Sequence, residues 1–169
     1  QNLEIGASLL SANRDIIDRL GASAGMTPVD LSLSDTRWAP RAAWSWSPLE
    51  NTTLTASWSR SYEPPTYNDL FYTTGPMLAR ELRSTPLEWQ SADSFEIGAQ
   101  GHCDRLRWSA SVYYASWENE FLRLVDASGS PRGTVNAGDT IHSGFEGGVE
   151  WDLLPDSKTG LSVWASYSY

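Results

Sequence analysis

Hydrophobic and polar residues alternate one by one along most of the chain, and this period of two is typical of β-strands. Leu54, Ala56 and Trp58, for example, are separated by single Thr and Ser residues. The same alternation predicts seven strands, over residues 2–9, 36–46, 51–60, 94–101, 107–124, 144–153 and 161–169. Because each strand has one apolar and one polar face, we expect an all-β protein.

The connections between the predicted strands alternate between long and short. Residues 11–35, 61–91 and 124–135 form long or medium loops, whereas residues 47–51, 102–106 and 154–159 form short turns. Short turns on the periplasmic side and longer loops outside are typical of outer-membrane barrels, and a soluble β-sandwich has no reason to sort its loops in this way. The first loop has room for one helical turn at Ile16–Leu20, and no segment predicts a stable helix.

The aromatic content agrees with a membrane barrel. The chain has nine Trp, seven Tyr and four Phe, several of them near predicted strand ends, where membrane barrels carry aromatic girdles. No stretch approaches the roughly 18 consecutive apolar residues that a transmembrane helix needs. A helical membrane protein is therefore excluded, whereas barrel strands expose only alternate residues to lipid.

The net charge and the reactive residues of the chain argue against nucleic-acid binding, metal or cofactor binding, and catalysis. The formal net charge is −9, and Lys158 is the one Lys, which argues against nucleic-acid binding. Cys103 is alone, so no intrachain disulfide or thiolate cluster forms, and we expect neither a metal site nor a cofactor. No nucleophile elbow or phosphate loop is present. His142 is near Asp139 and Glu146, but no base and nucleophile stand in a recognisable order, so we expect no enzyme.

Three segments resemble the barrel domain of TonB-dependent receptors. They are Ser59–Leu70 with its Ser-Arg-Ser-Tyr-Glu-Pro start, Ser94–Gly101 with Glu-Ile-Gly, and Val135–Glu150 with Asn-Ala-Gly and Gly-Phe-Glu. Each motif alone is weak, but the three occur in the order and at about the spacing of that family. The resemblance covers nearly the whole chain. It implies a barrel of about 22 strands around a plug, in the outer membrane of a Gram-negative bacterium, with import driven by TonB.

The fold class that we expect is therefore an incomplete antiparallel transmembrane β-barrel segment of about seven strands. Residues 1–169 form part of the barrel domain, without the plug and the remaining strands. The chain begins at Gln1 without Met or signal peptide and stops at Tyr169 inside a predicted strand, so we expect a piece of a longer protein. Seven strands cannot close so wide a barrel, and we expect this piece to transport nothing by itself.

Glu96 and Glu146 are the candidate plug contacts. They fall on the polar faces of two strands that we place next but one in the barrel. In lipid the polar face points to the lumen, and a buried carboxylate needs a partner. The resemblance implies that Arg residues of the plug are that partner. The alternative is that both carboxylates are solvated charges of the lumen.

Candidate ligand-binding residues lie on the outer loops and the upper lumen. They are Arg60, Tyr62, Tyr67, Arg80 and Arg83. Arg and aromatic side chains suit ferric siderophores, which are often anionic or rich in catechols. The alternative is ordinary loop chemistry. We expect the long loop Ser61–Gln90 to move on ligand binding.

The resemblance implies a receptor that takes up a ferric siderophore or a similar scarce nutrient. Its partners would be outer-membrane lipid, its own plug, the TonB complex and the ligand. One alternative keeps the architecture but imports another ligand, such as a cofactor, vitamin B12 or a glycan. Two alternatives belong to other classes, a soluble carbohydrate-binding β-sandwich and a hydrolytic outer-membrane barrel, and the latter lacks a Ser-His constellation here.

Overall fold

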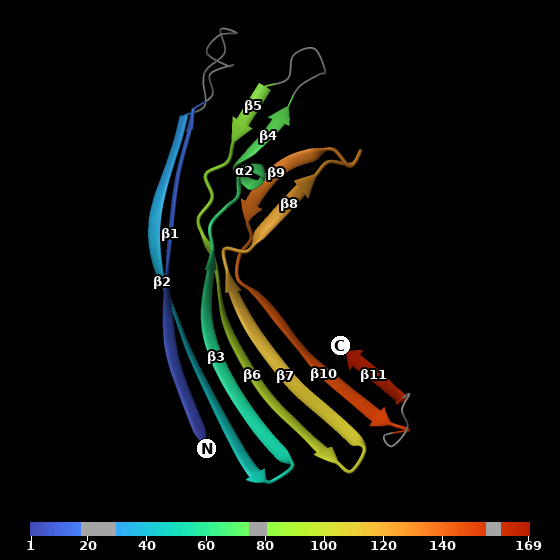
Figure 1. The fold of residues 1–169 in the computed structure, drawn as a ribbon. Coiled ribbons are helices and arrows are strands. Elements are labelled where there is room, and N and C mark those ends of the chain that lie inside the picture. Colours follow the sequence, from blue (N-terminus) through green and yellow to red (C-terminus); the bar gives the residue numbers. More distant parts are fainter. Residues whose placement is uncertain (18–29, 75–80, 155–159) are drawn as a thin grey trace.

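The computed structural model describes residues 1–17, 30–74, 81–154 and 160–169. Within these residues, seven strands form one antiparallel sheet in which each strand pairs with the next along the chain. In sheet order they are β1 (Asn2–Ile17), β2 (Asp30–Leu49), β3 (Thr52–Glu63), β6 (Gln90–Cys103), β7 (Leu106–Glu118), β10 (Thr140–Asp152) and β11 (Ser162–Ser168). The sheet is curved and does not close on itself (Figure 1). The expected all-β, antiparallel fold is confirmed.

The register of the strands sorts side chains onto two faces. Trp58, Phe95 and Tyr114 are partners on one face, which we call the apolar face. Ser57, Glu96 and Tyr113 are partners on the other, which we call the polar face. On the apolar face Ile97 is 64% exposed. Because large apolar side chains of the sheet point into open space, the sheet is built as a barrel wall and not as half of a sandwich.

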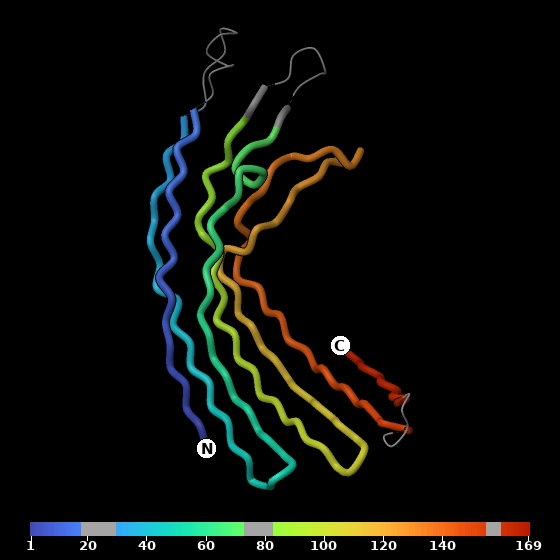
Figure 2. Tube along the Cα trace, viewed as in Figure 1, coloured from blue at the N-terminus to red at the C-terminus, as the bar shows by residue number. Residues whose placement is uncertain are grey.

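The connections lie at opposite ends of the sheet according to their length. The turn between β2 and β3 and the turn between β6 and β7 lie at one end, and the longer connections lie at the other, outer end (Figure 2). Asp104 closes the second turn with a φ of 51°, in the left-handed region that Asp tolerates better than most residues. The predicted sorting of loops is confirmed for these connections, and most of the predicted turn 154–159 lies outside the described residues.

The strands β1 and β2 extend further outward than the sequence predicts. Residues 11–17 and 30–35 are strands instead of loop, and Ile16 belongs to β1 instead of a helical turn. The ladder continues through Asp15 and Ser32, whose hydroxyl donates to the Asp15 carboxylate at 2.7 Å. The prediction was wrong because the apolar residues change face here: Ile16, Leu31 and Leu33 lie on the same face as Arg41, so the alternation of the apolar face does not continue to the outer ends.

The outer connections carry structure of their own. They contain α2 (Tyr67–Leu70), β4 (Phe71–Thr74), β5 (Glu81–Ser84), β8 (Phe121–Val125) and β9 (Pro131–Asn136). The predicted strand 107–124 was wrong as one element, because Asn119 with a φ of 57° separates β7 from β8. The predicted loop 124–135 is the end of the β8–β9 hairpin. We call the described residues of 64–89 and 119–139 the outer cap.

The buried apolar cluster of the described residues lies in this outer cap. Leu70, Phe71 and Leu87 form its centre, with Leu70 at 0% exposure. Partly buried residues pack around it: Ile16, Leu31, Leu33 and Phe121. The single helical turn α2 is the one described helix, and it is too short to cross a membrane.

Candidate functional site

Glu96 in β6 and Glu146 in β10 face the same side of the sheet. Strand β7 lies between them, and Glu96 is level with Tyr113 while Glu146 is level with Ser111. Both carboxylates are exposed and line one hollow of about 510 Å³. The expected placement, on the polar faces of two strands next but one, is confirmed.

Glycines near these carboxylates let neighbouring side chains approach the backbone closely. A Cβ on Gly98 would lie 2.8 Å from Oγ1 of Thr55, and one on Gly144 would lie 2.6 Å from the Tyr113 hydroxyl oxygen. These contacts are closer than real Cβ atoms make, so any larger residue would displace a neighbour. Thr55 and Tyr113 therefore pack directly on glycine backbone here, and Gly98, Gly147 and Gly148 line the hollow together with the two carboxylates.

Other charges on the polar face are neutralised within the sheet. Arg107 contacts Glu150 at 3.1 Å and Asp152 at 2.7 Å. Among the residues that the structure describes, no Arg, Lys or His forms an ion pair with Glu96 or Glu146. The two carboxylates thus present their negative charge to whatever occupies the hollow.

Arg60 and Tyr62 lie on the opposite side of the sheet. Arg60 follows Trp58 by two positions and so continues the apolar face at its outer end. Its guanidinium contacts Asp93 at 3.4 Å and Glu118 at 3.2 Å, and lies 5.4 Å from the centre of the Tyr62 ring. Arg60 therefore ties β3, β6 and β7 together, and the structure does not bring it to the hollow.

The other ligand candidates belong to the outer cap. Tyr67 begins α2, is 55% exposed, and places its ring 4.9 Å from that of buried Phe71. Arg83 is exposed in β5. Arg80 lies outside the described residues. The structure thus separates the four described candidates into an outer-cap pair, Tyr67 and Arg83, and the strand pair of Arg60 and Tyr62.

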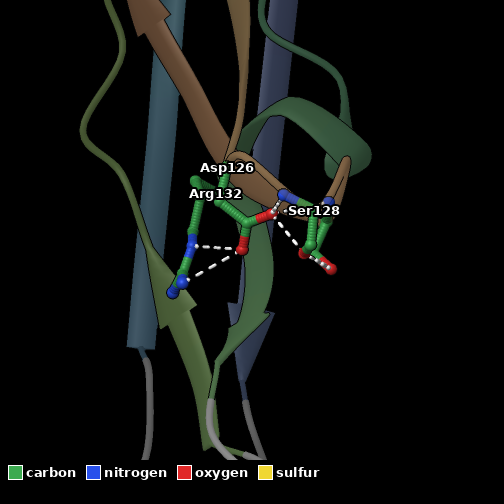
Figure 3. Close-up of polar contacts among 4 residues, drawn as sticks. Asp126, Ser128 and Arg132 are labelled. Carbon is green, nitrogen blue, oxygen red and sulfur yellow. Dashed lines mark hydrogen bonds and ion pairs between the residues drawn. The ribbon is translucent and has the colours of Figure 1, made fainter.

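The tip of the β8–β9 hairpin is organised by Asp126 (Figure 3). Its Oδ1 accepts from the backbone N–H groups of Ser128 and Ser130, both at 2.9 Å, and its Oδ2 accepts from Arg132 Nε at 3.1 Å. The Ser128 hydroxyl is the largest of the contacts that lower the pKa of Asp126 to about 2. Sequence reasoning gave this segment only as a loop, although Asp-x-Ser-x-Ser indicates side-chain bonds to the local backbone.

A second polar cluster lies where the hairpin returns to the wall. His142 Nε2 is 3.2 Å from Glu120 Oε2, which also accepts from the Thr140 hydroxyl. The Thr140 bond and then the His142 contact lower the pKa of Glu120. The sequence pointed to Asp139 and Glu146 as neighbours of His142 and missed Glu120. The described residues contain no group of three or more His, Cys, Asp or Glu that could hold a metal ion.

A curved antiparallel meander with an exposed apolar face and a hollowed polar face is the wall of a membrane β-barrel. A family model described as TonB dependent receptor-like, beta-barrel matches residues 9–169. The chain therefore belongs to the TonB-dependent receptor family, whose members are receptors and transporters of the Gram-negative outer membrane. No curated protein sequence matches the chain.

Solved structures of this family share the fold. The copper transporter OprC matches with a TM-score of 0.61 and 21% identity, over 83% of this chain and 22% of that one. The siderophore receptor PirA from Pseudomonas aeruginosa matches with a TM-score of 0.60 and 16% identity, over 99% of this chain and 34% of that one. The Serratia marcescens hemophore receptor HasR was solved with its hemophore HasA and heme. It matches with a TM-score of 0.62 and 16% identity, over 89% of this chain and 27% of that one. The chain thus spans about a fifth to a third of the length of these proteins.

Proposed function

We propose that this chain is part of the barrel wall of an outer-membrane receptor that takes up a ferric siderophore. The observation that carries the proposal is the family match over residues 9–169, on a sheet whose apolar face suits lipid and whose polar face suits a lumen. PirA, one of the structures with this fold, is a siderophore receptor. Barrels of this width hold a plug in their lumen, so the active receptor contains more than these strands.

Glu96 and Glu146 contact the plug in this proposal. They line one hollow of the polar face, with β7 between them, and no cation of the described residues forms an ion pair with them. Once a plug fills the lumen these carboxylates lose water, and an unpaired buried charge is strongly unfavourable. Arg residues of the plug would supply charge-assisted hydrogen bonds.

The ligand is recognised at the outer end. Tyr67 and Arg83 lie in the outer cap, where an aromatic ring and a guanidinium suit an anionic, aromatic iron chelate. Arg60 acts mainly as a tie between strands, because two carboxylates already hold its guanidinium. A ligand that contacts Arg60 would have to compete with Asp93 and Glu118 for its guanidinium.

The experiment is ligand binding and uptake by the full-length receptor in its outer membrane. A ferric catecholate, a ferric hydroxamate, haem and Cu²⁺ are compared as quenchers of Trp fluorescence, followed by uptake of radiolabelled iron with and without TonB. Saturable binding of a ferric chelate and TonB-dependent iron uptake would support the proposal. Binding of haem or Cu²⁺ alone would move the function to another nutrient, and no binding to any probe would reject it.

The plug contact has its own test. The double variant Glu96→Gln/Glu146→Gln in the full-length receptor keeps the size of both side chains and removes both charges. We expect the plug to become sensitive to protease at lower urea, since breaking a buried ion pair costs about 3–5 kcal/mol. The matched control is Glu50→Gln/Asp104→Asn, which removes two charges from the short turns. Equal plug stability in both doubles would refute the plug contact.

A further inference from the structure

The two halves of the outer cap share one apolar core. Leu70, Phe71 and Leu87 come from the first cap loop (the described residues of 64–89), Phe121 comes from the second (residues 119–139), and Ile16, Leu31 and Leu33 of β1 and β2 pack against the same cluster. Leu70 is fully buried. Each loop therefore covers apolar side chains that the other would leave exposed to water.

Neither loop has the means to stay folded alone. The first contains a two-stranded sheet with strands of four residues, and the second contains one with strands of five and six. An isolated two-stranded hairpin in water is at best marginally stable. The order of each hairpin thus depends on packing from outside it, which the other hairpin supplies together with Ile16, Leu31 and Leu33 of the wall.

Close contact at Gly133 adds to this dependence. The ring of Tyr72 in β4 lies against Gly133 in β9, so that a Cβ there would lie 2.8 Å from Tyr72 Cδ1. Thr134, the next residue of β9, is 2% exposed. Arg123 of β8 reaches Asp69 of α2 at 3.7 Å. The absence of a side chain at Gly133 in the second loop thus makes room for the Tyr72 ring of the first loop.

Two amide side chains fasten the loops at their base. Asn136 accepts from the Glu88 N–H at 2.9 Å and donates to the backbone oxygens of Glu88 at 3.0 Å and Asn119 at 2.8 Å. Gln90 donates to Glu63 at 2.6 Å and accepts from the Phe121 N–H at 3.0 Å. We call Gln90 and Asn136 the amide clasp. Asn136 bonds backbone groups of both loops, and Gln90 joins the second loop to Glu63 at the end of β3, so moving the loops apart would break these hydrogen bonds.

We propose that the outer cap is one cooperative body, so that any opening of one cap loop is shared by the other. A ligand that orders or displaces the first loop then changes the second loop as well, even without touching it. Coupling of this kind follows when two segments are stable only together. The two cap loops therefore open and close as one unit instead of independently.

Hydrogen exchange of the full-length receptor in detergent, without ligand, tests this coupling. Asn136→Ala should raise exchange about tenfold in residues 121–136 and also in residues 67–74, which Asn136 does not touch, because it removes three hydrogen bonds between the loops and their base whose net contribution is on the order of that factor. Leu70→Ala, in the first loop, should likewise raise hydrogen exchange in both segments. Asn68→Ala removes an exposed amide from α2 and is the matched control, expected to change neither segment.

The outcomes separate the cooperative body from two independent loops. Faster exchange in both segments for either variant supports the proposal. Faster exchange only in the loop that carries the substitution overturns it, as would an equal response to Asn68→Ala. Should Asn136→Ala fail to assemble in the membrane, Leu70→Ala alone gives the same decision. The readout needs no ligand, so its result is independent of which nutrient the receptor carries.

Discussion

The barrel wall and the outer cap of this chain follow opposite rules of burial. Along the wall, large apolar residues such as Ile5, Ile97 and Trp151 are more than half exposed, and the backbone ladder holds the strands together. In the outer cap, Leu70, Phe71 and Leu87 are buried in a small core of the kind found in water-soluble proteins. One chain thus contains a wall whose apolar side chains are exposed and a cap whose apolar side chains are buried.

The difference shows which solvent each region is built for. The wall lacks an internal core because lipid replaces it on one face and a plug replaces it on the other in our proposal. In our proposal the cap lies outside the lipid, where the hydrophobic effect of water applies. The same type of substitution should therefore have different effects in the two regions.

The largest effect is expected from Leu70→Ala. A fully buried Leu replaced by Ala costs about 2–5 kcal/mol, which is more than a small cap is expected to withstand. We expect the cap to become sensitive to protease in the full-length receptor while the wall keeps its strand signal in infrared spectra. Leu9→Ala, on the exposed apolar face of β1, is the matched control. A cap that stays protease-resistant in Leu70→Ala would show that the cluster does not hold it.

A charge on the apolar face tests the wall. Ile97→Arg should cost about 2–4 kcal/mol if the residue lies near the middle of the membrane, because a guanidinium would then face hydrocarbon. Ser57→Arg places the same charge at a neighbouring level of the polar face, where it meets water and Glu96. Urea titration of both full-length variants refolded into lipid vesicles measures the difference. Equal losses of stability would mean that the two faces have been assigned wrongly.

The strands of the wall could be predicted from the sequence because a lipid-facing strand alternates apolar and polar residues. Where one face must be apolar, as around Trp58 and Ile97, alternation indicates both the strand and the side that each residue faces. The shared face of Glu96 and Glu146 follows from this rule alone. Arg60 could have been placed in the same way, since it stands two positions after Trp58, but its residue type suggested a ligand contact.

The outer cap was beyond this kind of prediction. Its core consists of residues without a common period, and its clasp joins Gln90 to a loop far along the chain. The outer ends of β1 and β2 carry Ile16, Leu31 and Leu33 on the face opposite to Trp38, so the alternation of the wall did not extend to them. His142 meets Glu120 only because the β8–β9 hairpin closes between them, a contact that no local pattern indicates.

Two glycines of the second cap loop sharpen the comparison between a packed and an open site. Gly129 has a φ of 81° and open space where a Cβ would lie, whereas Gly133 has a φ of 100° and the Tyr72 ring 2.8 Å from that position. Left-handed strain alone costs about 1–2 kcal/mol, and overpacking adds about 1–3 kcal/mol. We expect Gly133→Ala to increase hydrogen exchange of the cap more than Gly129→Ala does. Removing the ring in Gly133→Ala/Tyr72→Ala should reduce the excess, and equal effects of the single variants would contradict the contact.

The smallest effect is expected at the hairpin tip, where stability depends on one exposed carboxylate. The pKa of Asp126 is lowered from its ordinary 3.8 to about 2, first by the Ser128 hydroxyl and then by the Ser130 N–H. Because the folded tip prefers the ionised form, its contribution is complete above pH 3.8 and is lost as the pH falls towards 2. Hydrogen exchange of residues 126–132, corrected for intrinsic rates, should therefore increase over this range in the native receptor. In Asp126→Asn the tip should be looser at neutral pH and nearly independent of pH, because the titrating group is gone. The same acid response in both proteins would place the titration elsewhere in the outer cap, with the pKa of Glu120, also lowered, as the next group to test.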